Sequence, residues 1–89
     1  MLSEKDRIEI LAIAKKFNVK KVILFGSSCD PSRDGSDIDL AVDGVLDSQF
    51  FKFYRELIFS LSKPVDLIDL KIKNKFSDIA ISEGITLYG

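Results

Sequence analysis

The sequence has 89 residues, of which 46% are apolar and 30% charged, a composition typical of a single soluble globular domain. The absence of histidine and the presence of one cysteine exclude an intrachain disulfide, a Cys/His zinc site and a histidine-activated nucleophile. A net charge of −1 does not predict direct nucleic-acid binding, and no apolar run reaches the length of a membrane span. We therefore expect one cytoplasmic domain over residues 1–89.

The N-terminal half predicts one helix and two strands. Ser3 is a suitable N-cap for a helix over residues 4–17, in which apolar residues recur at helical spacing. These residues are Ile8, Leu11, Ala12 and Phe17. Asn18 is expected to end the helix. The β-branched and aromatic stretch that follows predicts a buried strand over 19–26. A loop over 27–35, by its composition, separates it from a second strand over 36–43.

The C-terminal half predicts a helix, a strand, a short helix and a last strand. Asp47 or Ser48 can cap a helix over 49–62, which presents one apolar stripe. The stripe consists of Phe50, Phe53, Tyr54, Leu57, Ile58 and Leu61. The later elements are expected at 65–70, at 75–83 with Gly84 at the C′ position, and at 85–88. The resulting order, α-β-β-α-β-α-β, predicts an α/β or α+β domain with a small mixed sheet and helices packed on it.

Acidic residues are concentrated in the middle of the chain. Residues 30–47 contain six aspartates against Arg33 alone, which gives this segment a net charge of −5. The six are Asp30, Asp34, Asp37, Asp39, Asp43 and Asp47. A segment this acidic is either solvated or holds a cation.

Asp37 and Asp39 form the most informative pair in this segment. Alternate residues of a strand share a face, so the two carboxylates point the same way, about 6.6 Å apart along the strand. Their repulsion favours a positive charge between them, and Mg²⁺ binds to a few carboxylates together with substrate phosphates. The alternative is a solvated strand face or a protected sheet edge.

Gly26 and Ser27 stand at the end of the preceding strand. A strand that ends in Gly-Ser can turn sharply and offer backbone N–H groups and a hydroxyl to a phosphate. An ordinary turn is the alternative. Nine residues separate Ser27 from the Asp-x-Asp segment on the next strand, so pairing of the two strands would place the phosphate site beside the carboxylates.

A third carboxylate is expected from the strand over 65–70. Asp66 and Asp69 are separated by an odd number of residues, so they face opposite sides and only one can join Asp37 and Asp39. Asp66, between two apolar neighbours, needs a partner more than Asp69, which we expect to serve the turn into Lys71. Three carboxylates can hold two Mg²⁺ ions and activate an attacking hydroxyl.

The chain resembles the minimal nucleotidyltransferases of the DNA polymerase β superfamily. The resemblance is carried by Leu24-Phe25-Gly26-Ser27, by the segment 35–42 (GSDIDLAV), by 65–70 (VDLIDL) and by the ending 82–89 (SEGITLYG). These motifs occur in the family's order and span most of the chain. The resemblance implies the nucleotidyltransferase fold.

The family resemblance also implies an activity and a partner. The implied reaction is Mg²⁺-dependent transfer of AMP from ATP to a hydroxyl, with Gly26 and Ser27 at the triphosphate, Asp37 and Asp39 as metal ligands, and Asp66 as the third catalytic carboxylate and metal ligand. Minimal chains of this kind resemble the antitoxin half of toxin–antitoxin modules. Their partner is an all-helical HEPN-type ribonuclease, silenced by adenylylation of a tyrosine.

Two features keep a second interpretation open. The loop between Ser27 and Asp37 is one residue shorter than in many members and lacks their Arg-Gly; Arg33 could bind phosphate from a shifted position or be a solvated loop residue. Phe51 and Phe59 lie off the apolar stripe of their helix and could form a partner or homodimer surface. The alternative function is therefore a catalytically weak module that neutralises a helical partner by binding.

Overall fold

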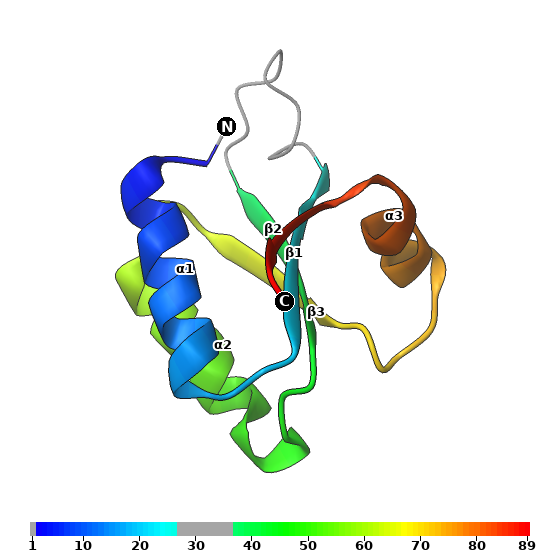
Figure 1. The fold of residues 1–89 in the computed structure, drawn as a ribbon, viewed down its shortest axis with the longest axis horizontal. Helices are drawn as coiled ribbons and strands as arrows, with labels where there is room; N and C mark the ends of the chain where they lie inside the picture. Colours follow the sequence, from blue (N-terminus) through cyan, green and yellow to red (C-terminus); the bar gives the residue numbers. More distant parts are fainter. Residues whose placement is uncertain (1, 27–36) are drawn as a thin grey trace.

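The structure is a mixed sheet with helices on both faces (Figure 1). It is a computed structural model that describes residues 2–26 and 37–89, and these residues form three α-helices and one four-stranded sheet. The elements are α1 (Glu4–Lys16), β1 (Lys21–Phe25), β2 (Ile38–Asp43), the 3-10 helix η2 (Asp47–Gln49), α2 (Phe50–Ser60), β3 (Val65–Asp69), α3 (Lys75–Glu83) and β4 (Ile85–Tyr88). The predicted order and the predicted α+β class are confirmed.

The strand order in the sheet is β3-β2-β1-β4. β1 is antiparallel to both β2 and β4, whereas β2 and β3 are parallel. One end of the sheet therefore gathers the C-terminal end of β1 and the N-terminal ends of β2 and β3. The pairing of β1 with β2 therefore brings Gly26 to the same end of the sheet as Asp39, as the sequence predicted.

The two faces of the sheet are covered unequally. In Figure 1, α1 and α2 lie together on one face, and α3 lies alone on the other. Ile38, Leu40 and Val42 of β2 point into the core beneath α1 and α2. Because side chains alternate along a strand, the intervening residues of β2, including Asp39 and Ala41, belong to the face beneath α3.

Helix α1 begins and ends where the sequence predicts, but it buries a different face. Ser3 accepts a hydrogen bond from the Asp6 N–H, and Asn18 has the left-handed φ of 56° that ends the helix. The buried residues of the helix are Asp6, Ile10, Ile13 and Ala14, whereas Ile8 is 53% exposed. The predicted stripe through Ile8 and Ala12 is wrong because α1 is apolar on more than one side, so packing against the sheet selects the face.

The structure confirms most of the apolar stripe predicted for α2, but the predicted N-cap of this helix is wrong. Phe53 and Leu57 are fully buried, and Phe53 packs edge-on against Phe17 of the α1 terminus, with ring centroids 5.3 Å apart. Ile58, expected on the stripe, is half-exposed. Neither Asp47 nor Ser48 caps α2, because both lie in η2 and the N-cap, Gln49, makes no side-chain capping bond.

The end of α3 is also corrected. Gly84 is the C-cap itself, not the C′ residue that the sequence predicted, and its backbone is extended (φ −77°, ψ 168°). A Cβ at Gly84 would lie 2.3 Å from Cγ2 of Ile23, so glycine is needed for the close approach of the chain to β1. At its other end, α3 has a complete capping box between Asn74 and Ser77.

The remaining differences are small shifts of element ends. β1 and β2 begin two residues later than predicted, at Lys21 and Ile38, and α2 ends at Ser60. None of the helices in residues 2–26 and 37–89 has the length and apolar character needed to cross a membrane.

Candidate active site

Asp39 and Asp66 lie side by side at one end of the sheet. They are register partners on the parallel strands β2 and β3, which places their backbones about 4.8 Å apart. Phe25 is the register partner of Asp39 on β1, so Phe25, Asp39 and Asp66 form one row across three strands. The alternation of buried residues puts this row on the face that α3 partly covers.

The electrostatics of the row are dominated by crowded negative charge. The pKa of Asp39 is raised, first because partial burial disfavours its charged form, and then because Asp66 and Asp37 repel that charge. Asp37, directly before β2, is half-buried, and Asp66 is exposed. Both of the other carboxylates that the sequence selected therefore act on Asp39 in the folded protein.

Gly26 completes this end of the sheet beside Asp39. It follows β1 with a left-handed φ of 69°. A Cβ at this position would lie 2.4 Å from Oδ2 of Asp39, so every other residue would displace the carboxylate. Glycine therefore lets the backbone pass next to the carboxylate row, where a phosphate group would have to approach.

A cavity of about 410 Å³ opens over this row. Its lining consists of Phe25, Gly26, Asp39, Asp66, Leu67, Ile68, Phe76 and Ile79. Asp39, Asp66 and Gly26 make one part of the wall polar, while Phe76 and Ile79 of α3 add an apolar part. The sequence analysis missed these two residues, because an isolated apolar pair on a short helix cannot be distinguished from ordinary core.

The other residues singled out in the sequence fall into two groups. Asp69 does not join the carboxylates: its Oδ1 accepts a hydrogen bond from the Lys71 N–H at 3.0 Å, which is the turn role predicted for it. Ser27 and Arg33, assigned to the triphosphate, lie outside the described residues.

The donor set at this end of the sheet fits Mg²⁺. Carboxylate oxygens are the ligands that this ion prefers, and a divalent cation would offset the repulsion that raises the pKa of Asp39. In residues 2–26 and 37–89, no three acidic or cysteine side chains are gathered closely enough to form a complete metal site by themselves. One or two carboxylates are sufficient for Mg²⁺ when substrate phosphates supply the remaining oxygens.

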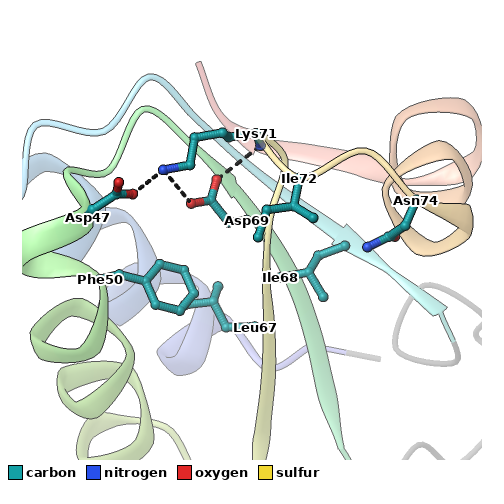
Figure 2. A pocket seen from close by; sticks show the side chains of 8 residues that line it. All are labelled: Asp47, Phe50, Leu67, Ile68, Asp69, Lys71, Ile72 and Asn74. Carbon is teal, nitrogen blue, oxygen red and sulfur yellow. Dashed lines mark hydrogen bonds and ion pairs between the residues drawn. The ribbon is translucent and has the colours of Figure 1, made fainter.

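A second cavity, of about 390 Å³, lies at the opposite end of β3 (Figure 2). Its apolar wall includes Phe50 and Leu67, while the Lys71 ammonium forms ion pairs with Asp47 and Asp69 at its edge. Asp47 thus joins η2 to the end of β3 instead of capping α2. The two cavities share Leu67 and Ile68, but neither Asp39 nor Asp66 lines this second one.

The comparisons with known proteins agree with this geometry. A model of the family described as "Polymerase beta, Nucleotidyltransferase" matches residues 8–89. The chain belongs to this family. A search of curated proteins gave no match.

Solved structures show the same fold. The chain is similar to a toxin–antitoxin structure with AMP-PNP, with a TM-score of 0.75 and 24% identity over 93% of this chain and 73% of that one. It is also similar to the MntA-HepT toxin–antitoxin, with a TM-score of 0.72 and 22% identity over 98% of this chain and 73% of that one. A third similar structure is a tri-AMPylated Shewanella oneidensis HEPN toxin in complex with MNT antitoxin. Its TM-score is 0.70, with 23% identity over 94% of this chain and 70% of that one.

Proposed function

We propose that this chain is a Mg²⁺-dependent adenylyltransferase that transfers AMP from ATP to a hydroxyl group of a partner protein. The observation that carries the proposal is the in-register pair Asp39 and Asp66 beside Gly26, at one end of a nucleotidyltransferase fold. Membership of the family supports nucleotidyl transfer. The use of ATP, the dependence on Mg²⁺ and the transfer to a protein go beyond family membership and are part of the proposal.

The predicted site residues would divide among metal binding, phosphate binding and proton transfer. Asp37 and Asp39 would hold Mg²⁺, with Asp66 as a further ligand, and the ion held there would supply positive charge to the phosphates. Gly26 and Ser27 would bind the β- and γ-phosphates, with Arg33 adding positive charge. Asp66 would accept the proton of the acceptor hydroxyl.

The bonding changes are those of a phosphoryl transfer. The acceptor oxygen forms a bond to the α-phosphorus of ATP, while the bond from that phosphorus to the bridging oxygen of pyrophosphate breaks. The products are AMP esterified to the acceptor, pyrophosphate and the proton held by Asp66. The chain's own contribution is to fix the phosphates and the acceptor at one row of carboxylates.

We propose a HEPN-type helical protein as the acceptor. The similar structures named above are toxin–antitoxin complexes, one of them with a tri-AMPylated HEPN toxin. On this chain, Phe51 and Phe59 are 83% and 81% exposed on α2, about two helical turns apart and away from the carboxylate face. Exposed aromatic side chains of this kind are typical anchors of a protein interface.

The test uses a HEPN-type protein encoded beside this chain's gene. After incubation with the purified chain, ATP and Mg²⁺, intact mass spectrometry is expected to show mass gains of whole AMP units. The double variant Asp37→Asn/Asp39→Asn should give none, because it removes two of the charges that hold the ion. Asp43→Asn, an aspartate of the same strand at its far end, is the matched control and should transfer AMP normally.

AMP transfer that persisted in the double variant would contradict the proposal. A second function is favoured by the exposed Phe51 and Phe59: neutralisation of the partner by binding alone. In that case the double variant would still neutralise the partner, while Phe51→Asp or Phe59→Asp would not. Loss of neutralisation in the double aspartate variant, with the complex intact, would exclude binding alone.

A further inference from the structure

The cavity over the carboxylate row is apolar on one side only. Phe76 and Ile79, three residues apart on α3, share a face of that helix and line the cavity together with Ile68 of β3. The Phe76 ring is 61% exposed, an unfavourable position for an aromatic side chain unless something covers it. The polar side of the same cavity contains Asp39, Asp66 and Gly26.

The strand order fixes the direction from the polar side to the apolar side. In the order β3-β2-β1-β4, Gly26 follows β1 and Ile68 belongs to β3, so they lie on opposite sides of Asp39. A nucleotide with its outer phosphates at Gly26 and its α-phosphate at Asp39 and Asp66 would extend its nucleoside toward β3 and α3. Phe76 lines the same cavity as Ile68, so it is within reach of a nucleoside placed there.

The size of the cavity favours a nucleoside over a partner side chain. Small-molecule sites have volumes of about 300–1,000 Å³, and this cavity has about 410 Å³. A single amino-acid side chain would leave most of that space empty, whereas a nucleoside joined to its α-phosphate would occupy it. An aromatic ring next to such a space is suited to a flat base, because stacking on it depends little on base identity.

We propose that Phe76, supported by Ile79, is the stacking platform for the nucleobase of the bound nucleotide. This inference rests on the proposed function and extends it to a residue of α3 that the motif pattern does not contain. The platform binds any base through its flat face, so it predicts affinity for nucleoside triphosphates in general and no strict preference for adenine.

The test measures binding, so it does not depend on turnover or on the partner. Titration calorimetry of the full chain with Mg²⁺ would compare ATP, CTP and inorganic tripolyphosphate, which has no base. Phe76→Ala is expected to weaken binding of ATP about tenfold and to leave binding of tripolyphosphate unchanged, since it removes one aromatic stacking contact. Phe76→Tyr keeps the flat ring and should bind ATP like the wild type.

The matched control is Ile8→Ala, which removes an exposed apolar side chain from α1 on the other face of the sheet. It should change none of the three affinities. Phe76→Ala should fold normally, because its side chain is exposed and its backbone N–H keeps its bond to Asn74 Oδ1.

Three results would count against the platform. Equal ATP affinity in Phe76→Ala and the wild type would overturn it and leave the proposed function standing. In a separate turnover assay, a raised KM of Phe76→Ala for the acceptor protein with unchanged nucleotide affinity would assign the cavity to the acceptor instead. Absence of ATP binding in the wild type would overturn the proposed function itself, and the platform with it.

Discussion

The face of the sheet beneath α1 and α2 differs from the face beneath α3 in what it buries. Among the described residues, the first face has a core cluster of fifteen apolar side chains, and the second has four. Those four are Ile23, Phe25, Ala41 and Ala80. The short α3 therefore covers only part of its face and leaves the row of Asp39 and Asp66 open. The comparison indicates that one face stabilises the fold and the other is free for polar chemistry.

The largest expected effect tests the first face. Phe53→Ala should lower the free energy of unfolding by about 3–5 kcal/mol, because it removes a fully buried ring and leaves a cavity between α1, α2 and the sheet. Urea unfolding followed by circular dichroism would measure the loss. Phe51→Ala, on the exposed side of the same helix, should change stability by less than about 0.5 kcal/mol. A similar loss in both variants would show that α2 is not stabilised mainly through its sheet-facing stripe.

A smaller effect tests the polar contact at the edge of this core. Asp6 is 3% exposed on α1, and its carboxylate accepts hydrogen bonds from the backbone N–H and the hydroxyl of Ser62, at 3.1 and 2.6 Å. Asp6→Ala should cost about 2 kcal/mol, since it leaves the Ser62 N–H without its partner. Ser62→Ala removes only the hydroxyl bond and should cost less. Equal unfolding midpoints for wild type and Asp6→Ala would show that the contact between α1 and the end of α2 adds nothing to stability.

The sequence was most informative where a pattern allowed only one answer. Alternation along the strand separated Asp66 from Asp69. The structure places Asp66 beside Asp39, and it places Asp69 at the end of β3, where its carboxylate accepts a hydrogen bond from the Lys71 N–H. The clean stripe of α2 likewise predicted the burial of Phe53 and Leu57.

Where several packing arrangements were physically possible, the sequence did not determine which one forms. Helix α1 has apolar residues on more than one side, so the burial of Ile10 in place of Ile8 depends on how the helix packs against the sheet. Phe76 had no motif around it, and its place in the cavity follows from the position of α3 over β3. Gly84 was recognised as an end signal, but its tight contact with Ile23 comes from the return of the chain to β1.

The smallest expected effect is a gain in stability, and it concerns Asp39 on the face beneath α3. The pKa of Asp39 is raised above its ordinary value of 3.8 by partial burial and by the charges of Asp66 and Asp37. The folded state therefore binds the Asp39 proton more tightly than the unfolded state does, and stability is lost as pH rises through this raised pKa. Asp39→Asn removes that loss. Without Mg²⁺ at pH 7, the variant should be more stable than the wild type by less than about 1 kcal/mol, because solvent screens these partly exposed charges.

Thermal unfolding in the presence of a chelator would measure this difference, which should disappear as pH falls below 3.8, where the wild-type carboxyl is also neutral. Adding Mg²⁺ and ATP should reverse the ranking, because ligand binding stabilises only a protein that still holds the ion. A variant less stable than the wild type at pH 7 would mean that Asp39 stabilises the fold. The row would then be structural, like the face beneath α1 and α2, and the division between a stabilising face and a chemical face would fail. A variant that is more stable without ligand and less stable with it would show that this carboxylate is maintained at a cost to stability for the ligand it binds.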